Sequence, residues 1–317
     1  MATLTISPED EKKVKARGFL SNKGTDNFSG RIITVNGKIT AEQQKLIGEA
    51  AEKFGNGIVT FTTRLTIEVQ GIPYDKIDDF CAYIAKAGLV TGGTVSKVRP
   101  VVAGKGTTCQ YGLLDSFGLS EEIHQRFYEG YRQVLLPHKF KIAVGGCPNN
   151  CVKPDLNDLG IIGQRIPNYE EDDCNGCKKC AVEKACPVNA AKMVDGVMEI
   201  DKDVCNNCGR CVGTCPFDCI EDGTYGYKIY IGGRWGKKVA QGQALSKVFT
   251  DKEEALSVIE KAILLFREQG QTGERFARTI ERLGFENVEK QLLSDDILGR
   301  KQEILDAKLH LTGGATC

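Results

Sequence analysis

The sequence predicts an α+β protein with two domains and a cysteine-rich segment inserted into the second. Strand-like and helix-like stretches alternate from residue 31 to residue 144 and resume after residue 224. Between them, nine of the 14 cysteines fall within residues 174–219. The 317 residues, of which 41% are hydrophobic and 26% charged, suit about two globular domains.

The first domain is expected to be a ferredoxin-like α+β unit, because its strands and helices alternate in the required order. Its predicted elements are a strand at 31–36, a helix at 40–54, strands at 58–62 and 65–69, a helix at 74–87 and a strand at 94–102. The first helix has apolar residues at helical spacing behind Thr40, whose hydroxyl suits an N-cap. Residues 1–29 are polar and have no clear assignment.

The second domain is predicted to continue on both sides of the cysteine-rich segment. Its elements are a helix at 119–134, strands at 140–144 and 227–231, an amphipathic helix at 251–268 and charged helices to about residue 308. We therefore expect a first domain at residues 1–100, a second at 101–168 and 224–317, and an inserted domain at 169–223.

Composition argues against several classes of function. The 42 basic and 42 acidic residues leave no net charge, which gives no support to a nucleic-acid-binding protein. No run of about 18 uncharged apolar residues is present, so no membrane-spanning helix is expected. The N-terminal residues lack the apolar core of a signal peptide, which favours the cytoplasm, where disulfides are rare. The cysteines are therefore expected to serve metal or redox chemistry.

Two repeated cysteine motifs predict iron–sulfur clusters. The first motif, at residues 174–187, spaces three cysteines as C-x2-C-x2-C before a Cys-Pro pair, and the second, at residues 205–216, reads C-x2-C-x2-C-x3-C-P. In bacterial two-cluster ferredoxins, each such motif gives three thiolates to one cluster and the fourth to the other. The expected 4Fe–4S ligands are Cys174, Cys177, Cys180 and Cys215 for one cluster, and Cys205, Cys208, Cys211 and Cys186 for the other.

Structural zinc is the alternative interpretation of these motifs, but zinc ligands usually come as C-x2-C pairs with long spacers. Residues 181–185 make the first motif two positions longer than the standard spacing, so its loop is expected to bulge. Cys81 is expected to be a buried thiol, Cys219 to lie in the core or beside a cluster, and Cys317 is terminal.

A second constellation combines three cysteines with four basic residues. The segment GGCPNNC carries Cys147 and Cys151 as C-x3-C, and Cys109 lies upstream in GKGTTCQYG. The basic residues, in the segments FTTR, KVRP and HKFK, are Arg64, Arg99, Lys139 and Lys141. The two lysines are two residues apart, so a strand would present both on one face.

These segments resemble the siroheme-dependent sulfite and nitrite reductases, in particular the C-type subunit of anaerobic sulfite reductases, which carries an inserted two-cluster ferredoxin domain. The FTTR, VRP, HKFK, GCPNNC and IGGRWGKK segments follow the family's order between residues 30 and 273. The resemblance implies an α+β fold, in which a ferredoxin-like sulfite/nitrite reductase half-domain accompanies a siroheme and 4Fe–4S domain.

The resemblance also implies a third 4Fe–4S cluster, coupled to siroheme. Its ligands would be Cys109, Cys147 and Cys151, and Cys151 would bridge to the siroheme iron. The family's fourth cysteine would stand at position 103, where this sequence has Ala103. A substitute ligand, a three-iron cluster and a weakened cofactor site are the alternatives, and we expect cluster and siroheme to be retained.

By the same resemblance, the four basic residues would bind the substrate. Arg and Lys side chains aimed into one pocket can hold a small oxyanion, stabilise developing charge and supply protons. His138 could relay protons, although a structural role is expected. The siroheme carboxylates need further cations. The candidates for siroheme binding beside Cys151 are Lys105, Lys153, Arg234, Lys237 and Lys238.

The resulting hypothesis is a siroheme-dependent sulfite reductase that catalyses the six-electron reduction of sulfite to sulfide. Nitrite is the rival substrate, and an electron-transfer subunit without siroheme is the alternative of a different class. No flavin or nicotinamide fingerprint is present, so electrons should come from a partner such as a ferredoxin or a flavoprotein subunit. The chain has one α+β unit where many relatives have two, which implies a homo-oligomer.

Overall fold

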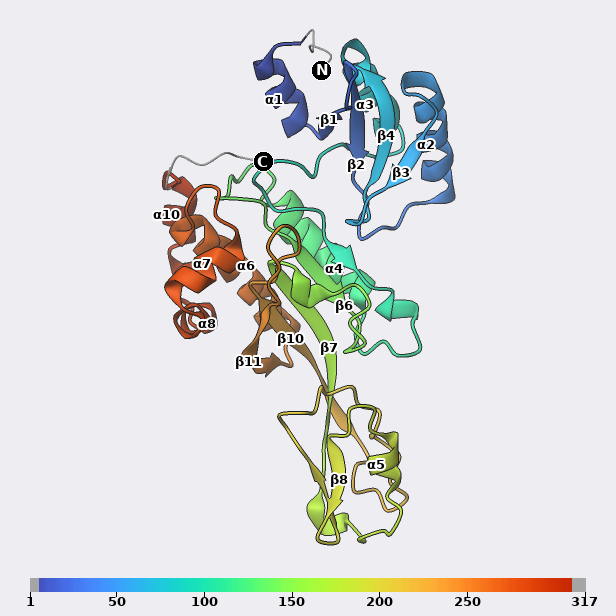
Figure 1. Cartoon of the computed structure of the whole chain (residues 1–317), viewed down its shortest axis with the longest axis vertical. Helices are drawn as coiled ribbons and strands as arrows, with labels where there is room; N and C mark the ends of the chain where they lie inside the picture. The colour runs from blue at the N-terminus through green and yellow to red at the C-terminus, as the bar shows by residue number, and fades with distance from the viewer. Residues whose placement is uncertain (1–5, 310–317) are drawn as a thin grey trace.

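The computed structural model describes residues 6–309, which form an N-terminal domain, a central body and a narrow lobe (Figure 1). The lobe, defined as residues 168–222, contains the cysteine-rich segment and extends away from the body. Within the described residues, no helix is long and apolar enough to cross a membrane.

The N-terminal domain is an antiparallel sheet, with strand order β1-β2-β4-β3, packed against helices. Its elements are α1 (Pro8–Ala16), β1 (Phe19–Ser21), β2 (Asn27–Ile32), α2 (Ala41–Phe54), β3 (Val59–Phe61), β4 (Ile67–Pro73), η1 (Tyr74–Lys76) and α3 (Ile77–Ala85). Phe19, Phe28 and Phe80 are fully buried at its centre, and the rings of Phe19 and Phe80 meet edge to face. The helices predicted at 40–54 and 74–87 are confirmed.

Two of the predicted strands differ from those observed. The strand predicted at 31–36 lies at Asn27–Ile32. Beyond it, the Ile33 N–H donates to the Val90 carbonyl at 2.9 Å, and the chain turns at Asn36, which has a left-handed φ of 52°. The strand predicted at 94–102 is wrong except at its end, where β5 spans Val102–Ala103. Val95, with φ 56°, interrupts the extended run, and Val98 makes only an isolated bridge to Phe140.

The central body is built on a mixed sheet with strand order β11-β10-β7-β6-β5. Strands β5, β6 and β7 are parallel, whereas β7, β10 and β11 are antiparallel. Its strands and the short helices between them are β5, η2 (Gly106–Thr108), α4 (Ser116–Ile123), the π-helix η3 (His124–Glu129), β6 (Ile142–Gly145), η4 (Pro154–Leu156), β7 (Leu159–Pro167), β10 (Gly223–Ile231) and β11 (Gln243–Phe249). The helix predicted at 119–134 therefore starts earlier and ends at Glu129.

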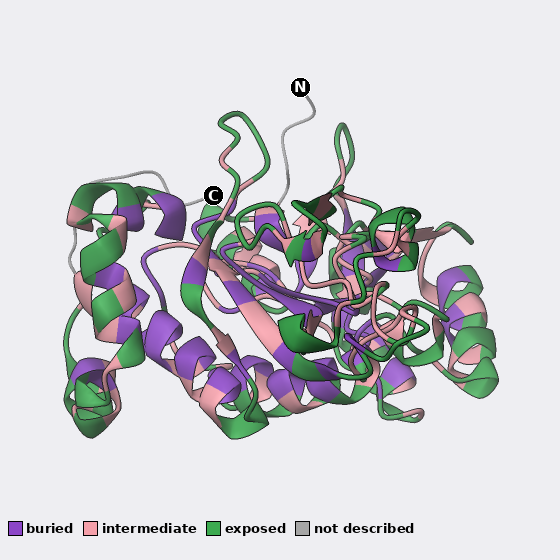
Figure 2. Ribbon diagram, turned by 90° about the horizontal axis from the view of Figure 1, so that it is seen from below, coloured by how far each residue is buried: buried purple, intermediate pink, exposed green. Residues whose placement is uncertain are grey.

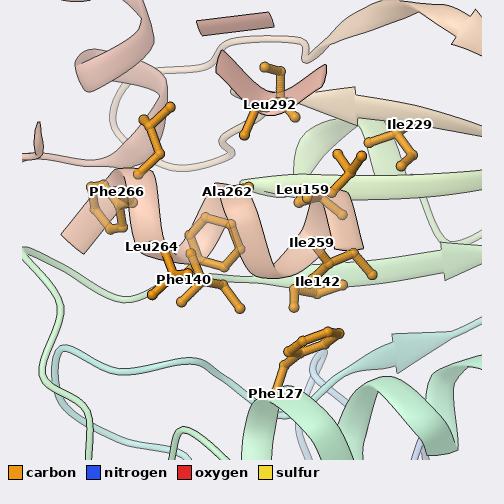
Figure 3. Close-up of a cluster of buried hydrophobic side chains, with 14 of the residues drawn as sticks. Phe127, Phe140, Ile142, Leu159, Ile229, Ile259, Ala262, Leu264, Phe266 and Leu292 are labelled. Atoms are coloured by element: carbon orange, nitrogen blue, oxygen red, sulfur yellow. The ribbon is translucent and has the colours of Figure 1, made fainter. Parts of the chain in front are cut away.

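The C-terminal helices cover this sheet. They are α6 (Lys252–Gln269), α7 (Phe276–Leu283), α8 (Phe285–Leu293), α9 (Asp296–Gly299) and α10 (Lys301–Asp306). Asp251 caps α6 by accepting from the Glu254 backbone N–H, so the helix begins where its apolar stripe predicts. Phe140 packs between Phe266 and Phe276, at ring distances of 5.9 and 5.2 Å, in the core shown in Figure 3. Figure 2 shows that the buried residues of the helices form stripes, with exposed residues on the outer faces.

The lobe is inserted in the chain between two paired strands of the central sheet. Strands β7 and β10 pair from Leu159↔Ile231 to Pro167↔Gly223, and the lobe begins where this pairing ends. It contains η5 (Glu171–Asp173), α5 (Ala181–Ala185), β8 (Ala191–Val194) and β9 (Val197–Ile200). The residues that lengthen the first motif form α5, so they coil into a short helix. A small core around Val182, Met198 and Ile220 joins the cysteine loops.

Candidate anion-binding cavity and thiol groups

A cavity of about 210 Å³ gathers basic side chains at the junction of the N-terminal domain and the central body. Its cationic lining residues are Arg31, Arg64, Arg99, Lys139 and Lys141. The structure therefore brings together all four basic residues expected to bind substrate and adds Arg31. We call this space the cationic cavity.

Arg64 is placed by the tight turn between β3 and β4. The Thr62 hydroxyl accepts hydrogen bonds from the backbone N–H groups of Arg64 and Thr66, both at 3.2 Å, and Leu65 has a left-handed φ of 58°. The Arg64 guanidinium then donates to Asn157 Oδ1 at 2.7 Å. Asn157 lies on the turn that follows Cys151, so this bond connects the cationic cavity to the cysteine loop.

Arg99, Lys139 and Lys141 come from two extended segments that lie side by side. The Arg99 backbone N–H donates to the Phe140 carbonyl at 2.8 Å, and the Arg99 side chain donates to the Gly93 carbonyl. Lys139 and Lys141 flank Phe140, whose ring is buried in the core on the opposite side. Because side chains alternate along extended backbone, burial of Phe140 directs both lysines toward the cavity. They precede β6 rather than lying within it.

Crowding of positive charge in a partly desolvated space changes the acidity of the cavity residues. Burial, followed by the charges of Arg64 and Arg275, lowers the pKa of Lys141 to about 8. Burial likewise lowers the pKa of Arg64 to about 10. An anion would be attracted to these groups, and Lys141 could exchange a proton near neutral pH.

His138 is unsuited to carry a positive charge at neutral pH. Burial and then the charge of Lys139 lower its pKa to about 4. Its Nδ1 atom accepts a hydrogen bond from the Lys139 backbone N–H at 2.8 Å. The imidazole therefore orients the lysine segment, in keeping with the expected structural role.

Two ion pairs that the sequence did not predict support the cavity. Arg31 pairs with Glu68 at 2.7 Å, on neighbouring strands. Arg275 pairs with the fully buried Asp158 at 2.9 Å, and Asp158 also accepts from the Lys141 backbone N–H at 2.9 Å. Arg275 and Asp158 are 117 residues apart, so no local spacing could have paired them.

Cys109, Cys147 and Cys151, which we call the inner thiol group, lie on two adjoining loops. Burial raises the pKa of Cys147, and the neighbouring thiols of Cys151 and Cys109 act in the same direction. The loops touch through glycines, because a Cβ on Gly146 would lie 2.5 Å from the Gly106 Cα. Three thiols expected to hold one cluster are thus neighbours.

Position 103 lies on β5, whereas Cys81 lies in the N-terminal domain. Ala103 is buried on β5 and pairs with Val144 of β6. Cys81 is in α3 of the N-terminal domain, beside Arg17 and Thr91. Cys317 lies outside the described residues.

The lobe brings cysteines of the two motifs together across the sequence. One cavity is lined by four thiols, those of Cys186, Cys205, Cys208 and Cys211. Burial, and then the charges of Cys205, Cys208 and Cys186, raise the pKa of Cys211 to about 11. Cys186 belongs to the first motif, so its position beside the second motif follows the exchange expected of two-cluster ferredoxins.

Three of the remaining lobe thiols, those of Cys174, Cys180 and Cys215, lie near the buried Cys219. Its pKa is raised to about 12 by burial and by Cys215, with further contributions from Cys174 and Cys180. Cys177 is half-buried in the same loop. Backbone N–H groups point at two ligand candidates, from Ala190 to Cys186 Sγ at 3.2 Å and from Met198 to Cys174 Sγ at 3.4 Å.

Every cysteine that the structure describes is a free thiol. Within the same residues, no three His, Cys, Asp or Glu side chains converge as they would around a single metal ion. The donor sets of the lobe, four thiols each and partly backbone-hydrogen-bonded, fit the chemistry of cluster ligation.

The candidate siroheme-binding cations are placed unevenly. The Arg234 side chain is largely buried and pairs with Glu281 at 3.4 Å, while its Nε atom has no hydrogen-bond partner among the described residues. Its loop rests on the turn after Cys151, since the Gly242 N–H donates to the Asp155 carbonyl at 2.7 Å. By contrast, four of the candidates are exposed and none lines the cationic cavity: Lys105, Lys153, Lys237 and Lys238.

Two family models match most of the chain. Residues 94–299 match the "Nitrite and sulphite reductase 4Fe-4S domain", and residues 21–87 match the "Nitrite/Sulfite reductase ferredoxin-like half domain". Both matched regions correspond to the α+β architecture described above.

Several curated proteins are similar in sequence. The coenzyme F420-dependent sulfite reductase of Methanocaldococcus jannaschii is 33% identical over 77% of this chain, which spans 38% of that relative. The C subunit of the anaerobic sulfite reductase of Salmonella typhimurium is 33% identical over 45% of this chain and 44% of its own length. The large subunit of the NADH nitrite reductase of Escherichia coli is 32% identical over 45% of this chain and 17% of its own. The chain therefore spans less than half the length of each.

One solved structure with a similar fold is that of dissimilatory sulfite reductase I. It superposes with a TM-score of 0.67 at 21% sequence identity, covering 84% of this chain and 69% of that one. The likeness supports the mixed α+β fold.

Proposed function

Because the chain belongs to the nitrite and sulfite reductase family, we propose that it is a siroheme-dependent sulfite reductase that reduces sulfite to sulfide with six electrons. The observation that carries this proposal is the convergence of Arg64, Arg99, Lys139 and Lys141 in one cavity. The Arg64–Asn157 bond joins that cavity to the turn after Cys151, where siroheme would attach.

The cavity residues account for binding and for proton supply. Arg64 and Arg99 stay charged at neutral pH and can hold oxyanion oxygens through paired N–H donors. Lys141, with a pKa of about 8, can release a proton to an oxygen that leaves as water and regain one from solvent. Lys139 adds positive charge where negative charge develops. When bound, siroheme would supply the redox-active iron, held by Cys151 and the Arg234 loop.

The thiol groups support a path for electrons into the chain. We propose that the lobe is an inserted two-cluster ferredoxin domain and that the inner thiol group holds a third cluster. A partner protein, such as a ferredoxin or a flavoprotein subunit, would reduce the lobe, because no flavin or nicotinamide fingerprint occurs in the sequence.

A homo-oligomer would supply the second α+β unit. We place the protein in the cytoplasm, because its thiols need a reducing compartment.

Nitrite is the second candidate substrate. It is also a small oxyanion, and the match to a nitrite reductase subunit supports it. The cationic cavity would bind either anion, so the substrate is decided by comparing kcat/KM for sulfite and nitrite with one artificial electron donor.

The decisive experiment is the absorption spectrum of anaerobically purified protein produced with ample siroheme supply. We expect strong Soret and Q-type bands and sulfite-dependent oxidation of a reduced viologen dye. A spectrum with only the broad shoulder of iron–sulfur clusters would overturn the enzyme and leave the electron-transfer subunit as the function.

A substitution in the cavity tests whether its cations act on the substrate. Lys139→Met keeps most of the length of the side chain but removes its charge, and we expect kcat to fall by about 10²–10³-fold. Lys228→Met is the matched control, because Lys228 is a half-buried lysine on β10 outside the cavity. Equal activity in the two variants would contradict the assignment.

A further inference from the structure

The lobe touches the central body through an arginine inside the second cysteine motif. The guanidinium of Arg210, which lies between Cys208 and Cys211, stacks over the ring of Tyr111 with Cζ 4.9 Å from the ring centroid. Tyr111 follows Cys109 by two residues and is 47% exposed. A single cation–π contact thus joins a loop of the second motif to a loop of the inner thiol group.

The backbone of the same lobe loop is fastened to β7. The Arg165 N–H donates to the Asn207 carbonyl at 2.8 Å, and Arg165 forms an isolated parallel bridge with Cys208. Gly209, with φ 65°, rests on the Arg165 side chain, where a Cβ would lie 2.7 Å from the Arg165 Cβ. Arg165 is itself stacked over Tyr225 of β10 at 5.2 Å. The loop is therefore anchored on one side to the β7–β10 pair and on the other to Tyr111.

The same contact brings the positive charge of Arg210 close to the inner thiol group, because Tyr111 lies two residues after Cys109. The first motif packs against a different part of the lobe, the turn between β8 and β9. Its Gly176 lies so close to this turn that an added Cβ would be 2.6 Å from the carbonyl oxygen of Gly196. Figure 1 places β8 toward the end of the lobe that is remote from the body. The two motifs thus lie at different distances from the inner thiol group.

We propose that Arg210 is a positioning residue for internal electron transfer, which holds the second motif beside the inner thiol group by stacking on Tyr111. Electrons then enter the lobe at the first motif and leave it at the second. In each event, the centre held by residues 205–211 loses one electron and the centre held by the inner thiol group gains it. A low-potential one-electron donor supplies the electron from outside. This inference rests on the cluster assignments of the proposed function.

The test uses the full chain with its clusters and four variants. Arg210→Gln removes the charge and the stacking, Arg210→Lys keeps the charge, and Tyr111→Leu removes the ring alone. Lys86→Gln is the matched control, because Lys86 stacks on Tyr83 at 4.7 Å in the N-terminal domain. Dithionite reduces each protein, and freeze-quench electron paramagnetic resonance follows the lobe signals and the inner signal separately. A redox titration gives the midpoint potential of each centre.

We expect Arg210→Gln and Tyr111→Leu to slow the appearance of the inner signal by about two- to fivefold. This is the factor by which an exposed cation–π contact favours the docked position of the loop. Lys86→Gln should behave as wild type, and Arg210→Lys should recover part of the rate. The inner potential should fall in Arg210→Gln, since a lost positive charge disfavours the reduced state, but stay unchanged in Tyr111→Leu and Arg210→Lys. A merely structural role would not separate charge from ring in this way.

Wild-type rates and potentials in both Arg210→Gln and Tyr111→Leu would overturn the inference, even if the protein reduces sulfite. Conversely, slowed transfer in a protein without siroheme bands would support the inference and overturn the proposed function. If Arg210→Gln does not take up its clusters, Tyr111→Leu decides, because the exposed Tyr111 holds no cluster. A wild-type rate in that variant would refute the role of the contact.

Discussion

At the scale of single residues, the cationic cavity depends on side chains whose charge is costly to bury. Lys141 donates its backbone N–H to Asp158, which is itself paired with Arg275. This arrangement fixes the position of Lys141 without neutralising its ammonium group. A lysine kept near its titration point both attracts an anion and exchanges protons.

The lowered pKa of Lys141 predicts how sulfite binding changes with pH. Below pH about 8 the ammonium group is charged and contributes to affinity, and above that pH the contribution is lost. We expect the Kd for sulfite, measured by calorimetry, to rise above pH 8 in wild type. In Lys141→Arg the rise should move to higher pH, because arginine stays protonated. The same pH profile in both proteins would exclude Lys141 as the titrating group.

The titration of Lys141 should affect stability in the opposite direction: the protein should become more stable as the pH rises, while sulfite binding weakens. Lys141 binds its proton more tightly in the unfolded chain than in the folded protein, so burial of the charged lysine lowers the free energy of unfolding. This loss of stability is complete below pH about 8 and disappears as the pH rises toward 10.5. Lys141→Met should therefore raise the Tm at pH 7 while weakening sulfite binding. A lower Tm would mean that the ammonium group stabilises the fold.

At the scale of elements, local sequence signals set where the helices begin. Thr40 and Gln43 form a reciprocal capping box at the start of α2, and Asp251 caps α6. The helices then bury apolar stripes against the two sheets. The π-helix at His124–Glu129 marks an element whose length the periodicity did not reveal.

The capping box of α2 gives a stability prediction. Thr40→Ala leaves the Gln43 backbone N–H without its hydroxyl acceptor, and we expect unfolding to become easier by about 1 kcal/mol in urea titrations. Thr40→Ser keeps the acceptor and should lie close to wild type. Equal losses in both variants would indicate that the threonine methyl group, and not the cap, is responsible.

At the scale of the whole molecule, the β7–β10 pair connects the lobe to the body. Nine residue pairs in continuous register make this connection. Near its outer end, Arg165 forms a β-bridge with Cys208 of the second cysteine motif. Continuous pairing of this kind keeps the lobe at a defined distance from the inner thiol group. The proposed exchange of cysteines between the motifs would then tie the two halves of the lobe together.

That exchange predicts a crossed result for two serine variants. Cys186→Ser lies in the first motif but should remove the cluster of Cys205, Cys208 and Cys211. Cys215→Ser lies in the second motif and should remove the cluster of the first. Electron paramagnetic resonance of the reduced proteins would distinguish the two remaining signals. Loss of each motif's own cluster would show that the motifs do not exchange ligands.

Much of this protein could be predicted from short-range patterns. Helical periodicity located α2, α3 and α6, and cysteine spacing singled out eight of the nine lobe thiols as candidate ligands, because capping, amphipathicity and loop ligation act over a few residues. Strand limits were less accurate, since isolated turns such as those at Asn36 and Val95 interrupt an extended run without a periodic signal.

The long-range contacts were decided only by the tertiary structure. The four basic residues could be grouped in advance by resemblance, but Arg31, the Asp158–Arg275 pair and the Arg210–Tyr111 contact could not. Their partners are brought together by sheet order and by the strand pair that carries the lobe. Such contacts depend on how whole elements pack, and a charged side chain carries no local signal of the distant residue that it will meet.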